Sequence, residues 1–462
     1  MKRFSQLREA PPERQISTAE PPLFSQKQLI SLIIPLVIEQ LLAITVGMAD
    51  TMMVSNVGEV AVSGISLVDT INNLFTTIFI ALATGGSVVV AQYIGKREPH
   101  NAEEAARQVF LAIVTLSTLI AALSIVFNHS ILAFLYRDLD PQVMENAQTY
   151  FYISALSYPF LGLYNSGAGI FRSMGNSKVT MYTSLVMNVV NITLNAVLIF
   201  GFQMGVAGAA IASLIARATA AAIVLILLRN PKNPVCVRTY ALKPKWSFIR
   251  HVLHIGVPTG LENGMFQVGK ILIAAQVAGF GTAAIAANAV GFSVAAVQII
   301  PGVGIGLAML TVVGQCIGAG RPEEARAYTW KLLKWIYLSH LALNALIFLG
   351  LNVIVRLYGL QNETAAIAKN LMIMYGLGAI TIWAPSFSIP NALRAAGDVK
   401  FTMVISILSM WLCRVLLSFL LGSFLGWGIY GVWAAMLMDW VFRGIFFIAR
   451  IRQGKWLEHE SV

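Results

Sequence analysis

The chain has 462 residues, of which 57% are hydrophobic and only 11% are charged. Soluble globular proteins carry about 25% charged residues, so this composition excludes a water-soluble protein. The formal net charge of +11 could suggest binding to nucleic acid. The positions of the basic residues therefore decide how that charge is interpreted.

Apolar stretches long enough to cross a bilayer recur along almost the whole chain. A polar tail at 1–27 precedes them and has no cleavable signal pattern, and a second polar tail follows at 451–462. We therefore predict an all-α polytopic membrane protein with twelve transmembrane helices. The predicted spans are 28–54, 63–93, 107–128, 145–171, 180–201, 204–228, 249–278, 284–317, 327–352, 368–390, 401–423 and 427–449.

The basic residues are distributed asymmetrically between the loops. With both termini in the cytoplasm, 25 of the 32 Lys and Arg residues fall in cytoplasmic segments and only three fall outside. The remaining four, Arg217, Lys270, Arg414 and Arg443, lie within spans. The positive-inside rule therefore predicts a multi-pass protein of the plasma membrane with both termini in the cytoplasm. It also explains the net charge without nucleic acid.

The two halves of the chain repeat each other at a nearly constant offset. Six helices per copy give both halves the same orientation, which is a parallel internal repeat. We predict an N-lobe at 28–228 and a C-lobe at 249–450, each of six helices, joined by a cytoplasmic loop at 229–248. The matching positions are Pro35 with Pro258, Glu39 with Glu262, 91–95 with 314–318, 171–178 with 393–400, and 205–208 with 428–431.

Ionisable residues inside the spans are the first candidates for function, because each costs about 2.5–3.5 kcal/mol to insert. Glu39 and Asp50 are eleven residues apart, which places both carboxylates on one helix face about 16 Å apart. Asn188, Asn191 and Asn195 form one polar stripe on the fifth span. A carboxylate facing carboxamide oxygens can coordinate a monovalent cation or exchange a proton. Alternatively, these groups only join helices by hydrogen bonds.

The C-lobe lacks an equivalent of Asp50, because the repeat places Ile273 at that position. Glu262 and Lys270 lie on one side of the seventh span. Two interpretations stay open for them: contact with a substrate, or an ion pair with each other. Gln267 on the same span is a further candidate for lining a cavity, as Glu39 is on the first span.

The other charges within spans have structural explanations. Arg414 and Asp439 are expected to form an ion pair between the last two spans, and both remain candidates for lining a cavity. Arg217 and Arg443 are expected to extend toward the cytoplasmic surface. The repeat contains two basic turns, at 171–178 and 393–400. Tight-turn geometry and anchoring at the cytoplasmic face explain them.

Several motifs that would indicate other functions are absent from the sequence. There is no G-x-x-x-x-G-K-[ST] phosphate loop, no H-E-x-x-H and no G-x-S-x-G. The three cysteines are scattered, without metal-binding spacing. We therefore expect neither an enzyme nor a bound cofactor, and we expect active transport to be driven by an ion gradient.

From about residue 28 to 450 the chain resembles the multidrug and toxic compound extrusion (MATE) transporters. The motifs that carry the resemblance are P-x13-A-D-T from Pro35 to Thr51, A-Q-Y-I-G with E-E-A after it, the R-x-x-G-x-x-K turn, N-I-T-L-N, and G-V-A-G-A-A-I-A-S. The resemblance implies a monomeric exporter in the lipid bilayer. Such an exporter expels cationic or amphipathic small molecules in exchange for H+ or Na+.

The resemblance also implies a cation-coupling site in the N-lobe. Its residues would be Asp50, Asn191, Asn195 and Ser213, with Tyr150 nearby, and the first three would hold Na+. Asn195 stands where some members have aspartate, and Ser213 stands where many have threonine, so the coupling ion stays open. In one branch a glutamate lies about one turn further along the seventh span, so its role is not carried over to Glu262.

Two functions other than drug export are also compatible with a polytopic membrane protein. A flippase of the same superfamily, moving a lipid-linked oligosaccharide, would need a more cationic central cavity. Lys270 and Arg414 are compatible with such a cavity, whereas Glu39 and Glu262 argue against it. A channel or an intramembrane enzyme is the alternative from another class, and no catalytic constellation in the sequence supports it.

Overall fold

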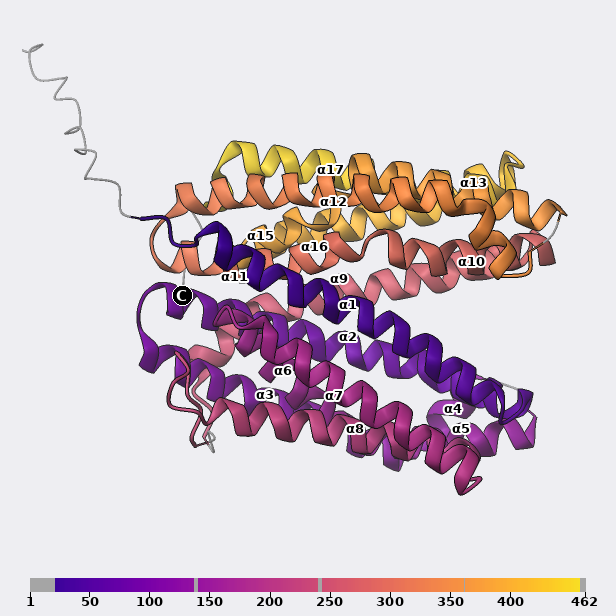
Figure 1. Cartoon of the computed structure of the whole chain (residues 1–462), viewed down its shortest axis with the longest axis horizontal. Coiled ribbons are helices and arrows are strands. Elements are labelled where there is room, and N and C mark those ends of the chain that lie inside the picture. The colour runs from indigo at the N-terminus through magenta and orange to yellow at the C-terminus, as the bar shows by residue number, and fades with distance from the viewer. Residues whose placement is uncertain (1–20, 137–139, 240–242, 361, 458–462) are drawn as a thin grey trace, which may run out of the picture.

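The computed structural model describes residues 21–136, 140–239, 243–360 and 362–457 of the chain. Within these ranges the chain consists of helices and connecting loops, without β-strands. Figure 1 shows the helices in two bundles that lie side by side along one long axis. We call the bundle from α1 to α8 the N-lobe and the bundle from α9 to α17 the C-lobe.

Local sequence specifies the starts of the N-lobe helices. Ser25 and Gln28 form a capping box, in which each side chain accepts the backbone N–H of the other residue. Asp140 caps α5, where Pro141 occupies the first turn. The N-lobe elements are α1 (Gln26–Ser55), α2 (Glu59–Gly95), α3 (Pro99–Val126), α4 (Asn128–Leu135), α5 (Pro141–Leu156), α6 (Tyr158–Ser173), α7 (Ser177–Asn195), the π-helical η1 (Ala196–Gly201) and α8 (Gly205–Leu228).

The C-lobe repeats this succession of long helices. Its elements are α9 (Trp246–Ala278), α10 (Thr282–Gln298), α11 (Ile300–Gly318), α12 (Pro322–Leu357), α13 (Asn362–Gly378), the π-helical η2 (Ala379–Trp383), α14 (Ala384–Phe387), α15 (Ile389–Ala395), α16 (Val399–Ser409), the π-helical η3 (Met410–Leu416) and η4 (Phe419–Phe424), α17 (Gly428–Gln453) and the 3-10 turn η5 (Lys455–Leu457).

Each of the twelve predicted spans coincides with one helix or one interrupted helix. Ten helices in the described ranges are long and apolar enough to cross a bilayer, so the chain is a multi-pass membrane protein. Two local features differ from the prediction. α3 begins at Pro99, ahead of the predicted 107, because proline suits a first helical turn. α4 was not predicted, because its eight residues are too few for a span.

Prolines interrupt the predicted fourth and eighth spans. α5 and α6 separate at Ser157, two residues before Pro159. α10 and α11 separate in the same way at Ile299, two residues before Pro301. Proline has no N–H to donate, and its ring clashes with the carbonyl one turn earlier, so a helix breaks or kinks near it.

The π-helical segments explain why the repeat offset is only nearly constant. η1 and η4 are equivalent segments of the two copies, and each follows the basic turn of its own copy, at 171–178 and 393–400. Between its basic turn and η4, the C-lobe holds one residue more than the N-lobe, and it has a further π-helical segment there, η3. A turn closed by an i→i+5 hydrogen bond holds one residue more than an α-helical turn. The extra residue of the C-lobe is therefore accommodated in η3, which carries Arg414.

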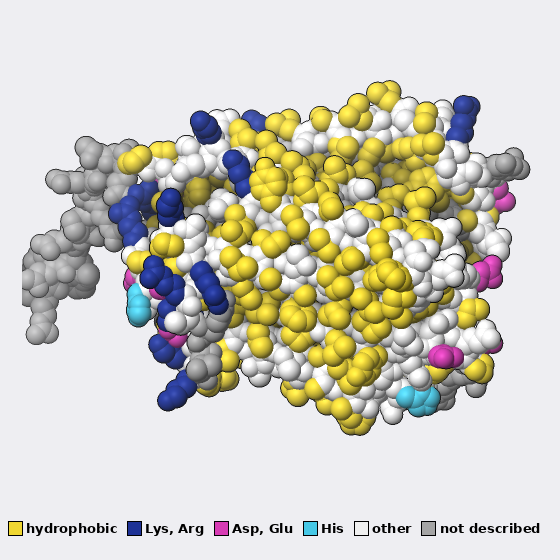
Figure 2. Space-filling view, turned by 60° about the horizontal axis from the view of Figure 1, so that its bottom comes forward, with side chains coloured by type: hydrophobic (Ala, Val, Ile, Leu, Met, Phe, Trp, Pro, Cys, Tyr) yellow, Lys and Arg dark blue, Asp and Glu magenta, His cyan; other side chains and the backbone are white. Residues whose placement is uncertain are grey.

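The two lobes meet along α1, α2, α9 and α11, and Figure 1 shows them diverging away from the end where α1 begins. Most of the Lys and Arg side chains visible in Figure 2 gather at this same end, while hydrophobic side chains cover the middle of that face. We call it the basic end. The lobes are thus packed together at the basic end and separate toward the other.

A reciprocal pair of contacts closes the basic end. Gln92 of the N-lobe donates to the carbonyl of Ala395 at 2.8 Å, and Gln315 of the C-lobe donates to the carbonyl of Ser173 at 2.6 Å. Both the donors and the acceptors are repeat equivalents, so the contact has approximate twofold symmetry. We call these two hydrogen bonds the glutamine latch.

Candidate functional site

The Asp50 carboxylate lies inside the N-lobe, toward the end of α1 that is far from the basic end. Asn195 on α7 donates to it at 2.8 Å. The Asn191 amide, turned so that its nitrogen faces the carboxylate, donates to Asp50 at 2.7 Å and accepts from Ser213 on α8 at 3.2 Å. Three helices therefore converge on one half-buried carboxylate, and we call these four residues the Asp50 cluster.

A second carboxylate, Asp69 on α2, lies beside the Asp50 cluster. Tyr150 and Asn72 both donate to Asp69 at 3.3 Å. Arg217 on α8 interacts electrostatically with both aspartates and donates to Ser157 at 2.6 Å. Within the described residues, no group of three or more His, Cys, Asp or Glu side chains could hold a metal ion. A monovalent cation here would rely on one carboxylate together with amide and hydroxyl oxygens.

Glu39 is buried in the middle of α1 and is held by two partners. Arg172, at the end of α6, lies 3.4 Å from its carboxylate, and Thr180 on α7 donates to it at 2.8 Å. The side chain of Arg172, in the basic turn between α6 and α7, therefore points into the lobe. The positive charge compensates a carboxylate that would otherwise be buried alone.

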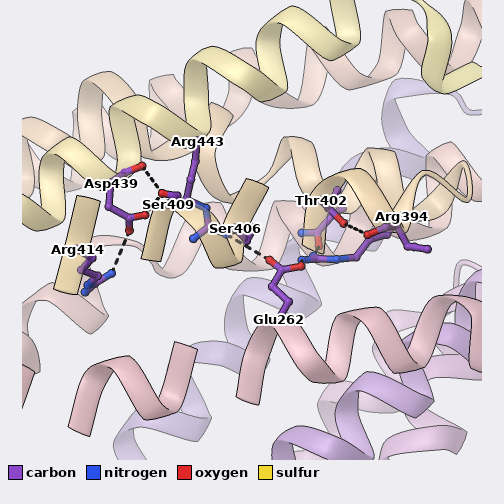
Figure 3. Close-up of polar contacts among 10 residues, drawn as sticks. Glu262, Arg394, Thr402, Ser406, Ser409, Arg414, Asp439 and Arg443 are labelled. Atoms are coloured by element: carbon purple, nitrogen blue, oxygen red, sulfur yellow. Dashed lines mark hydrogen bonds and ion pairs between the residues drawn. The ribbon is translucent and has the colours of Figure 1, made fainter. Parts of the chain in front are cut away.

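Glu262 on α9 has the equivalent place in the C-lobe, with one more cation. Arg394, the repeat equivalent of Arg172, lies 2.7 Å from its carboxylate, and Arg443 on α17 lies 3.3 Å away. Arg443 also donates to Ser406 at 2.7 Å. Figure 3 shows Glu262 reaching up from α9 between the two arginines.

A separate polar group lies in the same row of Figure 3, further from the basic end. Arg414 on η3 is 3.5 Å from Asp439 on α17, and Ser409 donates to the other carboxylate oxygen. Asp439 is fully buried. Lys270 on α9 lies close by, with its ammonium 5.0 Å from the centre of the Phe266 ring, and the Arg414 guanidinium is 4.9 Å from the same ring.

Three cavities adjoin these groups. A cavity of about 280 Å³ lies between the lobes, where Glu39 and Arg172 face Leu307 of α11. A cavity of about 650 Å³, the C-lobe cavity, contains Lys270 and Arg414. A third, of about 230 Å³, surrounds Glu262. We call the first the seam cavity.

The cavities share walls with one another. Val303 lines both the seam cavity and the C-lobe cavity, so these two are neighbours. Phe266 and Phe387 line both the C-lobe cavity and the cavity around Glu262. The largest space thus adjoins both the interface between the lobes and the buried Glu262 group.

The sequence model of the MatE family matches the chain twice, at residues 35–197 and 258–420. The two matches start at Pro35 and Pro258, which are equivalent positions of the internal repeat, and together they cover more than half of the chain. The chain belongs to the MatE family. The resemblance inferred from the motifs is confirmed.

Relatives of this MatE chain align over nearly their whole length. It is 26% identical over 441 residues to the "Probable multidrug resistance protein NorM" of Thermotoga maritima, covering 93% of each chain. It is 28% identical over 439 residues to the "Uncharacterized transporter YisQ" of Bacillus subtilis, covering 93% of this chain and 95% of that one.

Solved structures share the fold of this MatE chain. A MATE structure in the straight conformation aligns with a TM-score of 0.85 at 19% identity, covering 93% of this chain and 96% of that one. A MOP superfamily transporter from Pyrococcus furiosus aligns with a TM-score of 0.85 at 19% identity, covering 94% and 97%.

In this MatE chain, the residues predicted for cation coupling lie together. Asn191, Asn195 and Ser213 gather at Asp50, and Tyr150 lies at the neighbouring Asp69. Their juxtaposition needs α1, α7 and α8 to converge, which the spacing of residues along single helices could not show.

Of the two interpretations left open for Glu262 and Lys270, the ion pair with each other is not formed in this structure. Glu262 pairs with Arg394 and Arg443 instead. Eight residues correspond to about 12 Å along a helix, so Lys270 lies two turns away, in the C-lobe cavity. Gln267, on the same helix, is half-buried and is not among the described residues that line the C-lobe cavity.

The predicted ion pair between Arg414 and Asp439 is confirmed, although only Arg414 lines the C-lobe cavity. The expectation that Arg217 and Arg443 extend to the cytoplasmic surface is wrong. Arg443 is 4% exposed and bonded to Glu262, and Arg217 points to Ser157 inside the N-lobe. Both arginines have an acidic or polar partner nearby, and a partner stabilises a buried charge more than partial hydration does.

The sequence interpretation missed the role of Arg172 and Arg394, which it explained by turn geometry and anchoring. The signal was present in the repeat. Glu39 of the first copy recurs as Glu262 in the second, and Arg172 recurs as Arg394. Oppositely charged residues that recur together are candidates for contact within each copy.

The two glutamate groups predict different sensitivity to the loss of an arginine. Replacing Arg172 in Arg172→Gln leaves Glu39 without a cation in its described surroundings, whereas Arg394→Gln leaves Glu262 with Arg443. We expect Arg172→Gln to lower the free energy of unfolding by about 3 kcal/mol, and Arg394→Gln to lower it by less than half of that. Thermal unfolding in detergent, with the exposed Arg356→Gln as control, measures both. Equal shifts for the two variants would contradict the expectation.

Proposed function

We propose that this chain is a secondary exporter that moves amphipathic small molecules out of the cell in exchange for H+ or Na+. The observation that carries the proposal is the Asp50 cluster, a carboxylate inside the membrane region with amide and hydroxyl groups around it. Intramembrane carboxylates of this kind mark ion pathways. The name of the Thermotoga relative, a probable multidrug resistance protein, agrees with such a role.

The proposed orientation places the basic end in the cytoplasm of a cell whose plasma membrane the protein crosses. It follows the positive-inside rule, applied to the Lys and Arg residues gathered at that end. The Asp50 cluster then lies in the outer half of the membrane, where an incoming cation would meet it first. The lobes are packed together at the cytoplasmic end, so this conformation is the outward-facing one.

The proposed coupling runs along α1, which carries both Asp50 and Glu39. This helix packs on α7 within the N-lobe and on α11 across the interface. Binding of a cation at Asp50 removes its negative charge and so changes its attraction to the amides of α7. Glu39, about 16 Å away on the same helix, lines the seam cavity. A change in how α1 packs therefore reaches the cavity and the opposite lobe together.

Reconstituted protein tests the proposal directly. Proteoliposomes with the same ethidium concentration inside and outside are given an imposed pH gradient, an imposed Na+ gradient, or neither. We expect ethidium to move against its own gradient with one of the two ions, which identifies the coupling ion. Ethidium movement that neither gradient drives would contradict ion-coupled export.

A further inference from the structure

The C-lobe cavity occupies the place in its lobe that the Asp50 cluster occupies in the N-lobe. Three of its lining residues are the repeat equivalents of groups around Asp50. The equivalent pairs are Asp50 with Ile273, Ser213 with Met436, and Arg217 with Trp440. The N-lobe carboxylate and its neighbouring arginine are therefore replaced by apolar and aromatic side chains.

The charge at this place is also reversed. Lys270 and Arg414 both line the C-lobe cavity, about 5 Å from the Phe266 ring. Asp439 lies 3.5 Å from Arg414 and is fully buried behind it. Among the described residues, no carboxylate lies within ion-pair distance of Lys270. Of the two cations in the cavity, Arg414 is thus paired with a carboxylate, and Lys270 is not paired with one among the described residues.

The surrounding interior of the C-lobe does not supply the missing negative charge. Glu262 is the next carboxylate, and it is shared by Arg394 and Arg443. Counting these groups with Lys270, Arg414 and Asp439, four cations face two carboxylates. The Lys270 side chain is exposed and lines the cavity, so the open place for a partner of opposite charge is the cavity itself.

The walls of the cavity suit an apolar body with rings. Its volume of about 650 Å³ is in the range of sites for drug-sized ligands. Aromatic side chains from six elements of the lobe line it: Phe266, Phe292, Tyr375, Trp383, Phe387 and Trp440. Ring contacts of this kind recognise flat apolar groups.

We propose that the C-lobe cavity binds an amphipathic organic anion, a carboxylate or sulfonate on an aromatic body. Lys270 contacts the acid group, Arg414 adds a second positive charge, and the aromatic walls hold the rings. This assignment rests on the proposed export function, since it names a class of substrate for the same transporter. Cationic compounds are repelled from this cavity by Lys270 and Arg414.

Equilibrium binding tests the assignment independently of transport. Isothermal titration calorimetry on purified protein in phosphatidylcholine nanodiscs compares 2-naphthoate, 2-naphthalenemethanol and 2-naphthylmethylamine, which share one ring system and differ in charge. We expect the anion to bind most tightly. We expect Lys270→Gln to weaken it at least about tenfold and Lys270→Arg to weaken it less than threefold, because the positive charge that faces the acid group is lost only in the first.

Lys331→Gln is the matched control. Lys331 also lies over an aromatic ring, 5.5 Å from the centre of Trp335, but on α12 and away from the cavity. We expect naphthoate affinity to be unchanged in this variant. Equal affinity for the three ligands, or naphthoate binding that Lys270→Gln does not weaken, would overturn the assignment even if ethidium export is intact. Absent ethidium export with charge-selective binding would instead count against the proposed function alone.

A lipid headgroup could present the same charge as a soluble anion. The titration is therefore repeated in nanodiscs that contain phosphatidylglycerol. Unchanged naphthoate affinity supports a water-soluble ligand. A loss of more than tenfold overturns that part of the assignment, because the anionic lipid then occupies the cavity.

Discussion

An Asp50→Asn variant is expected to reach the membrane in normal amounts and to lose export by about 5- to 150-fold, the usual range of coupling between two sites. The physical reason is that asparagine neither exchanges a proton nor carries the charge that holds a cation. Dye efflux from cells, together with the amount of protein in isolated membranes, measures the two parts of the expectation.

The same variant should fold, because the substitution removes a charge without changing shape. Asp50 is half-buried, and an asparagine oxygen can still accept from Asn195. Asp140→Asn is the matched control. It also removes one carboxylate, but from an exposed helix cap, where asparagine is as good as aspartate. Export at the normal rate by Asp50→Asn would contradict the proposed role of this residue.

Much of the architecture could be predicted from the sequence because it depends on local composition. A span needs about twenty apolar residues, and the boundaries follow caps and prolines that act within one or two turns. The internal repeat predicted the equivalent lobes. Even the interruption of two spans has a local cause, in Pro159 and Pro301.

Contacts between distant helices were harder to predict. Glu262 could reach Lys270 on its own helix by spacing alone, but its partners come from α15 and α17, 132 and 181 residues away. Which of several buried cations approaches a carboxylate depends on helix packing, and packing is not encoded in the period of one helix.

The positive charge of the C-lobe cavity was also not predictable from the spacing of residues in the sequence. Arg414 lies in η3, the π-helical segment that accommodates the extra residue of the second copy. One added residue turns a helix by about 100°, so the faces of the two copies cannot be compared by a constant offset through this segment. The sequence predicted that Arg414 pairs with Asp439, and the structure adds that the pair lies beside an uncompensated lysine.

Gly95→Ala and Gly318→Ala are each expected to hold the basic end open and to lower export by about tenfold. A Cβ atom on Gly95 would lie 2.1 Å from the carbonyl oxygen of Gln315, and one on Gly318 would lie 1.9 Å from that of Gln92. Backbone oxygens cannot move aside as the end of a side chain can, so the helices themselves must separate. The glutamine latch then loses its geometry, and the outward-facing conformation loses population relative to the inward-facing one.

Spin labels at His100→Cys on α3 and Glu323→Cys on α12 report the separation of the lobes at this end. Both positions are exposed, and each belongs to a different lobe. In a background without native cysteines, we expect either alanine variant to shift the distance between the labels to longer values. Gly350→Ala is the control, because its Cβ would meet only the tip of Ile354 at 4.0 Å. Unchanged distances with normal export would show that the close approach of α2 and α11 is not required, whereas longer distances with lost export would tie transport to closure of the basic end.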